Sequence, residues 1–113
     1  MTTQIHQQNG ISILKPSGKI VGSAVSDLQQ VLLPAVKDSD SPRILLNFED
    51  VRMIDSSGLG VLIEAYIMSK QKKGRMGSIH IGKHIRNLIV VHRLVHLFEH
   101  FDTEEEAISA LSV

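Results

Sequence analysis

Residues 53–60 (MIDSSGLG) join two segments of different hydrophobic period, and this junction most restricts the fold that the chain can adopt. Before it, residues 44–48 (ILLNF) form a short apolar block typical of a buried β-strand, and after it apolar side chains recur at helical spacing. The two serines therefore fall at a helix N-terminus, where free backbone N–H groups and partial positive charge favour a side-chain oxygen or a phosphate. We expect any functional site of the chain at this junction.

Strand-like and helix-like segments alternate along the rest of the chain. We expect, in order, a hairpin over residues 5–20 that turns at Asn9 and Gly10, a helix from residue 23 that accommodates Pro34, a strand over 43–54, a helix over 57–73, a strand over 77–81, a helix over 84–97, a short strand over 98–101 and a final helix. Gly74 is expected in the left-handed conformation after the second helix, and Thr103 with Glu106 forms a capping box that opens the last one. The alternation predicts an α/β layer with parallel neighbouring strands.

The composition restricts the classes of function. Twelve basic residues balance twelve acidic ones, so no global field favours direct binding of nucleic acid or of a membrane. The chain has no cysteine, no leader-like start and no long apolar stretch, and we expect a cytoplasmic protein. Residues 1–113 have the size of a single domain that is too small for a buried cofactor cleft of its own, and no cofactor is expected.

The junction and the segment before it resemble a known family. Residues 55–61 (DSSGLGV), preceded by residues 44–51 (ILLNFEDV), are similar to the signature of STAS-domain anti-sigma-factor antagonists. The order of the hairpin, the helices and the closing segment 103–107 extends this resemblance over nearly the whole chain. It implies a STAS fold, with a central mixed β-sheet of four to five strands and about four helices, and a regulator that is not an enzyme.

The resemblance also implies a partner switch. In that family the unphosphorylated protein binds an anti-sigma factor that is also a serine kinase, and thereby displaces the sigma factor. Phosphorylation of the first serine of the motif releases the protein, and a metal-dependent serine phosphatase restores binding. By this resemblance Ser56 is the phosphoacceptor and Ser57 is the neighbouring helix cap.

The residues themselves are compatible with such a switch. A phosphate on Ser56 would add about −1.5 to −2 charges beside Asp55, in a surface otherwise matched to a neutral hydroxyl. Gly58 and Gly60 have no side chains to shield that hydroxyl, so an enzyme could approach the backbone closely. The alternative is that the serines only cap a helix and the glycines only ease its packing.

The helix after the junction carries a second apolar stripe, formed by Val61, Ala65 and Met68. One explanation is contact with a partner, since exposed apolar patches often mark interfaces and methionine adapts to different surfaces. The other is burial under a neighbouring helix of the same domain. The sequence does not separate these two explanations.

Several features leave the partner and the function class open. The loop at residues 18–23 (GKIVGS) lacks the acid that these antagonists commonly place there, so the identity of the kinase is not defined. A STAS interaction module of another signalling or transport complex, without phosphorylation of Ser56, is an alternative. Hydrolysis by Asp55 and Ser56 is disfavoured because no histidine or lysine has a motif relation to either serine.

Neither the histidines nor a nucleotide-binding motif indicates a further site. His92, His96 and His100 are spaced by four residues, which resembles the spacing of metal ligands. No cysteine and no His-Glu-x-x-His pattern accompanies them, so no metal site is predicted. No Walker loop is present, and nucleotide binding stays an open question.

Overall fold

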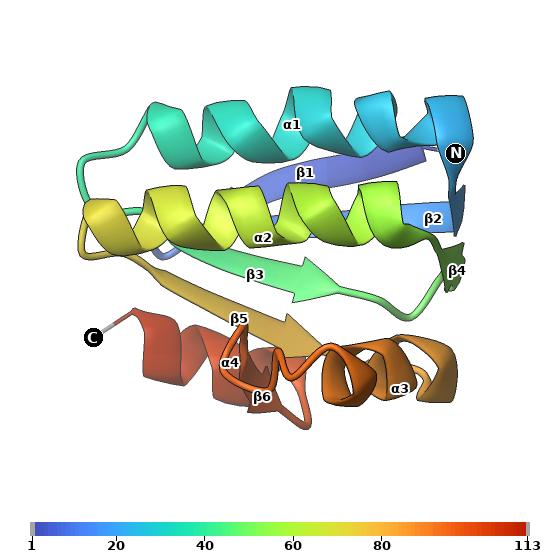
Figure 1. The fold of residues 1–113 in the computed structure, drawn as a ribbon. Coiled ribbons are helices and arrows are strands. Elements are labelled where there is room, and N and C mark those ends of the chain that lie inside the picture. Colours follow the sequence, from blue (N-terminus) through green and yellow to red (C-terminus); the bar gives the residue numbers. More distant parts are fainter. Residues whose placement is uncertain (1, 113) are drawn as a thin grey trace.

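The computed structural model describes residues 2–112 as a mixed sheet with helices on both faces (Figure 1). The elements are β1 (Thr2–Gln8), β2 (Ile11–Ile20), a 3-10 helix η1 (Gly22–Ala24), α1 (Val25–Lys37), β3 (Arg43–Asn47), β4 (Val51–Ile54), α2 (Ser56–Gln71), β5 (Arg75–Ile79), α3 (Lys83–Val91), β6 (Glu99–Phe101) and α4 (Glu104–Leu111). The strand order is β1-β2-β3-β5-β6, and β4 pairs with β2. The β1–β2 pair is antiparallel and all other pairs are parallel. The predicted α/β fold is confirmed.

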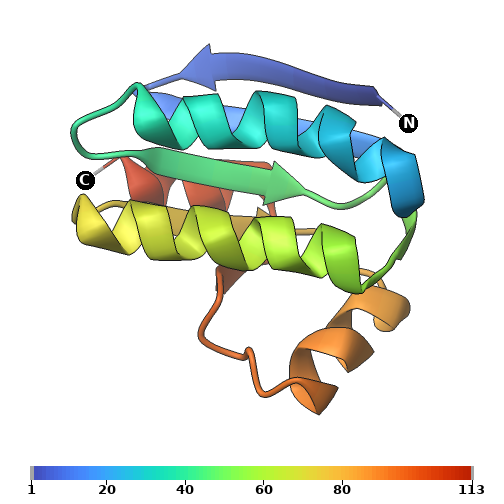
Figure 2. The same ribbon diagram turned by 45° about the horizontal axis from the view of Figure 1, so that its top comes forward.

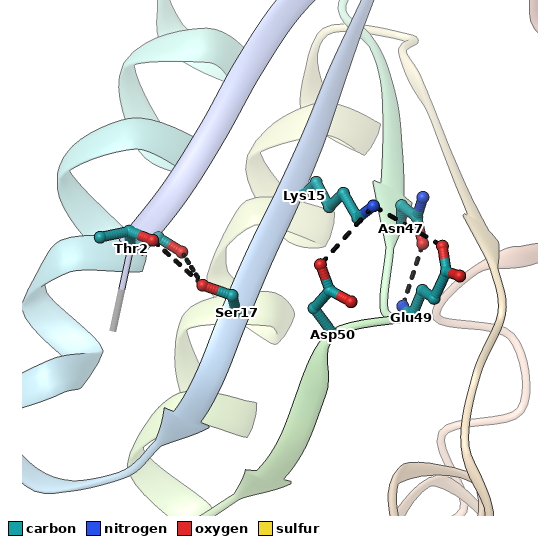
Figure 3. A network of polar contacts seen from close by, with 6 residues as sticks. All are labelled: Thr2, Lys15, Ser17, Asn47, Glu49 and Asp50. Atoms are coloured by element: carbon teal, nitrogen blue, oxygen red, sulfur yellow. Dashed lines mark hydrogen bonds and ion pairs between the residues drawn. The ribbon is translucent and has the colours of Figure 1, made fainter.

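The sheet within residues 2–112 has six strands rather than the expected four to five, because the segment 43–54 is two strands. The Val51 N–H donates to the Phe48 carbonyl at 3.0 Å, which closes a turn between them. The Asn47 side chain accepts from the Glu49 N–H at 2.9 Å, and Lys15 lies 3.6 Å from carboxylate oxygens of both Glu49 and Asp50 (Figure 3). These contacts redirect the chain, so β3 pairs with the first half of β2 and β4 pairs with its last residues.

Two hydrophobic clusters lie on opposite faces of the sheet. Figures 1 and 2 show α1 and α2 side by side over one face and α4 over the other. The larger cluster joins α1, α2 and α3 to the sheet, and its fully buried members include Leu14, Leu28, Leu32, Ile44, Leu46 and Leu62. The smaller cluster lies under α4 and contains Ile11, Ile13, Leu45, Ile79, Ala107, Ile108 and Leu111. Strand residues therefore alternate between two buried faces, as expected for parallel strands covered on both sides.

The hairpin and the last helix follow the sequence prediction. Asn9 and Gly10 both have positive φ, 54° and 77°, as a two-residue type I′ turn requires. The Thr103 hydroxyl caps α4 by accepting from the Glu106 N–H at 3.1 Å. Helix α1 continues through Pro34, which lies on its exposed side, and ends at Lys37.

Two helix ends differ from the prediction. Helix α2 ends at Gln71, and the left-handed residue after it is Lys73 (φ 57°) rather than Gly74. Gly74 is needed for a different reason, since a Cβ there would lie 2.5 Å from the Pro42 carbonyl oxygen. Helix α3 ends at Val91 instead of residue 97, because the following chain turns inward and buries Phe98 in the core.

Candidate functional site

The junction predicted from the sequence forms the N-terminus of α2, at the end of β4. Asp55 is the N-cap, with an extended backbone and a side-chain oxygen that accepts from the Gly58 N–H at 2.9 Å. Ser56 is the first helical residue, so the helix begins one residue earlier than predicted. The expectation that Ser57 caps the helix is therefore corrected. Asp55 reaches the free N–H groups of the first turn from the position before the helix, whereas Ser57 lies inside it.

The second carboxylate oxygen of Asp55 links α2 to the loop after β2. It accepts from the Gly22 N–H at 3.0 Å, and the Asp55 N–H donates to the Ile20 carbonyl at 3.2 Å. The N–H groups of Gly58 and then Gly22 hold the pKa of Asp55 below its usual value, because they stabilise the ionised form. The sequence indicated only that Asp55 stands beside the serines. Its contact with Gly22 depends on a residue 33 positions away, and no local pattern reveals such a pair.

The two serines are displayed to solvent. Ser56 and Ser57 are exposed, and among residues 2–112 the Ser56 hydroxyl has no hydrogen-bond partner. Gly60 is also exposed, and a Cβ built on it meets no atom within 4 Å. Because Gly60 lies one helical turn after Ser56, both share one face of α2. The approach to the Ser56 hydroxyl is therefore open beside Gly60, whereas Gly58, which was also expected to leave it unshielded, is buried.

Gly58 has a different role from Gly60. It is buried, and a Cβ there would lie 2.6 Å from Cγ1 of Ile54 and 2.9 Å from the carbonyl oxygen of Ile20. The first turn of α2 can therefore press against the ends of β2 and β4 only because this side chain is missing. Gly58 sets the position of the serines, and Gly60 leaves the surface beside them bare.

The apolar stripe predicted on α2 is largely internal. Val61 is 6% exposed and Ala65 is fully buried, and both belong to the larger core cluster, against which Met68 is partly buried. The expectation that this stripe contacts a partner is corrected, because α2 packs against both the sheet and the neighbouring helix α1 and therefore needs a wide apolar face. The exposed apolar side chain close in sequence to the serines is instead Met53, which is 42% exposed, whereas Ile67, 50% exposed, lies about three turns further along α2.

The three histidines spaced by four residues do not form a metal site. Helix α3 ends before His92, so the spacing of four residues does not place His92, His96 and His100 on one helix. His84 Nε2 lies 3.3 Å from the Ile54 carbonyl oxygen, whereas His100 Nδ1 lies 2.9 Å from the Ser78 hydroxyl. In the described chain, no group of three or more histidines and carboxylates has a geometry suited to a metal ion. Residues 2–112 also contain no helix with the length and apolar character needed to cross a bilayer.

Comparisons with known proteins identify the family to which this fold belongs. The STAS domain model matches residues 2–107, and the chain belongs to the STAS domain family. A relative from Paenibacillus polymyxa named anti-sigma F factor antagonist is 25% identical over 115 residues, which span 100% of this chain and 98% of the relative.

Solved structures share the fold over almost the whole chain. An anti-sigma factor antagonist from Mycobacterium paratuberculosis is 26% identical, with a TM-score of 0.84 over 99% of this chain and 94% of that one. The phosphorylated form of the Bacillus cell fate determinant SpoIIAA is 21% identical, with a TM-score of 0.76 over 96% of this chain and 98% of that one. The relatives named here are thus regulators of the anti-sigma-antagonist type, and the likeness to SpoIIAA concerns the fold.

Proposed function

We propose that this STAS domain is an anti-sigma-factor antagonist controlled by phosphorylation of Ser56. Unphosphorylated, it binds an anti-sigma factor that is also a serine kinase, and this binding frees a sigma factor. Phosphorylation of Ser56 releases the domain, and a metal-dependent serine phosphatase restores it. The observation that carries the proposal is the exposed, unpartnered Ser56 hydroxyl, held at a helix N-terminus in a family whose named relatives are anti-sigma-factor antagonists.

The charges around Ser56 support release rather than unfolding. Asp55 is held ionised by two backbone N–H groups, so a phosphate on Ser56 would stand beside a fixed negative charge. The N-terminus of α2 compensates the phosphate by about 0.3–1 kcal/mol, which keeps the domain folded. A partner surface matched to the neutral hydroxyl would face about two added negative charges, and like charges brought together at an interface cost several kcal/mol.

The contact surface is proposed to surround the serines. Gly60 leaves room for the partner backbone on α2, and Met53 offers an exposed apolar side chain on the neighbouring strand β4. Gly22 and Ser23 in the turn after β2 are both exposed, although the Gly22 N–H donates to Asp55. This turn contains no acidic residue. The partner therefore meets a surface that contains the ionised Asp55, and phosphorylation of Ser56 would add further negative charge at that point.

The first test identifies the modified residue. The purified protein is incubated with its cognate kinase and ATP, and the site is mapped by mass spectrometry. Phosphate on Ser56 supports the proposal. Phosphate on another residue, or none, overturns the proposed switch and favours a STAS module that acts without phosphorylation.

The second test measures the effect of charge on binding. Ser56→Asp is expected to weaken binding of the anti-sigma factor by about 1.4–3 kcal/mol, tenfold to more than a hundredfold, whereas Ser56→Ala retains it. Ser109→Asp is the matched control, because Ser109 is exposed on α4 at the opposite face of the sheet. Calorimetry that gives Ser56→Asp and Ser56→Ala the same affinity refutes release by charge.

A further inference from the structure

A cleft of about 400 Å³ lies between α3 and the carboxyl ends of the parallel strands β5 and β6. None of its lining residues belongs to the segment 53–60 that carries the serines. Its volume lies within the range of about 300–1,000 Å³ that is typical of small-molecule sites. Ligands of open α/β sheets also bind preferentially outside the carboxyl ends of strands. This cleft is therefore a candidate binding site that the proposed switch does not use.

One wall of the cleft is apolar. Ile89 and Val90 on α3, together with Val95 in the following turn, line it. Val90 is 59% exposed and Val95 is 50% exposed, so both leave apolar surface in contact with water. An apolar ligand would remove this surface from water at about 25 cal/mol per Å².

On the polar wall of the cleft, two contacts fix the position of the His100 side chain. Ser78 is 1% exposed, and its hydroxyl lies within hydrogen-bond distance of His100 Nδ1, at 2.9 Å. The His100 ring also packs edge-on against Phe98, with ring centroids 6.3 Å apart. These two contacts hold the imidazole in place before any ligand enters, which lowers the entropy cost of binding.

Arg86 contributes a positive charge to the cleft. It lines the cleft, and among residues 2–112 its guanidinium forms no ion pair or hydrogen bond. Arg86 precedes Ile89 and Val90 by three and four residues, so the charge and the apolar side chains share one face of α3. His80 and His100 add two imidazoles, and Asp102 adds one carboxylate. The cleft thus combines an unpaired guanidinium with an apolar wall, and Asp102 disfavours ligands with several negative charges.

We infer that this cleft binds a small amphipathic monocarboxylate. The carboxylate is paired with Arg86, whose planar guanidinium can donate two parallel hydrogen bonds to it. The apolar tail lies against Ile89, Val90 and Val95. A neutral molecule would leave Arg86 without a partner, and a polyphosphate would meet Asp102.

The test uses the full chain, labelled with ¹⁵N, in a titration followed by two-dimensional NMR. Sodium octanoate is the probe, and octan-1-ol is the matched ligand with a tail of equal length and no charge. Octanoate at up to about 1 mM is expected to shift amides of α3 and of residues 95–102. The affinity for octan-1-ol is expected to be lower by about tenfold, because it lacks the charge-assisted hydrogen bonds.

Two variants distinguish this site from nonspecific binding. Arg86→Gln is expected to lower octanoate affinity by about tenfold, and Val90→Asp is expected to abolish binding by adding a negative charge to the apolar wall. Lys83→Gln is the control, because Lys83 is an exposed cation on the same helix that does not line the cleft. Spectra of the free variants establish that each is folded. The inference is overturned by equal affinity for the alcohol, by wild-type affinity in Arg86→Gln, by shifts outside the cleft, or by no shifts.

Discussion

Replacing Gly58 with alanine is expected to destabilise the domain, whereas the same replacement at Gly60 is expected to stabilise it. Both glycines lie in the first turns of α2, so alanine lowers the entropy cost of helix formation at both by about 0.5–1 kcal/mol. Their surroundings differ. A Cβ at Gly60 meets no atom within 4 Å, whereas a Cβ at Gly58 would lie 2.6 Å from Cγ1 of Ile54 and 2.9 Å from the Ile20 carbonyl oxygen.

The difference between the two variants isolates the cost of that close contact. The propensity gain is common to both, so it cancels, and what remains is the strain of overpacking, about 1–3 kcal/mol. The upper part of this range is expected, because the Ile20 oxygen belongs to the backbone of a central strand and cannot rotate away. Gly58→Ala is therefore expected to lose about 1–2 kcal/mol against the wild type, and Gly60→Ala to gain about 0.5–1 kcal/mol.

Urea denaturation followed by far-ultraviolet circular dichroism measures both changes. With a slope of about 1–3 kcal/mol per M, the midpoints of the two variants should differ by about 1 M. Wild-type stability in Gly58→Ala would show that α2 can move away from β2 and β4 without cost. Destabilisation by Gly60→Ala would show that its surroundings are not open. Either result would contradict the account of how the serines are positioned.

Two further predictions concern the polar contacts. Asp55→Asn keeps only one carbonyl oxygen, so the Gly22 or the Gly58 amide is expected to exchange faster with deuterium, and unchanged protection of both would contradict the bridge. Arg75 holds the pKa of Glu99 below 4.5, so the ionised pair stabilises the fold above that pH, and this contribution is lost as the pH falls through the lower pKa of the folded state. Glu99→Gln is expected to lower the free energy of unfolding by less than about 1 kcal/mol at neutral pH, because both side chains are partly exposed. The loss is expected to be smaller still in acid. Urea titrations that give the same loss at neutral and at acid pH would refute this.

Local signals predicted most of the elements correctly. The turn at Asn9 and Gly10, the cap at Thr103 and the strand-to-helix junction before Ser56 each depend on the conformational preferences of a few neighbouring residues. Such preferences act within one turn of the chain, so they can be read without knowing the fold. The errors fell where a distant contact decides the outcome. Gly74 is an example, because the constraint on it comes from Pro42, in another segment.

At the site around Ser56, some features were likewise predictable from local sequence and others depend on distant contacts. Sequence patterns alone show that an acid, two serines and two glycines stand where a helix begins, and that this motif resembles one family. The folded structure adds that Asp55 is the cap and that it also holds Gly22. It also decided that Gly58 is buried while Gly60 is bare.

The burial of the apolar stripe on α2 likewise depends on tertiary packing. Periodicity shows which side chains of a helix share a face, but it does not show how many faces are covered. Val61 and Ala65 are buried because α1 lies beside α2 on the same side of the sheet. The sequence determined the position and chemistry of the serine site, through local preferences of its residues. The tertiary structure determined what surrounds that site, because burial and long-range hydrogen bonds depend on segments that meet only after folding.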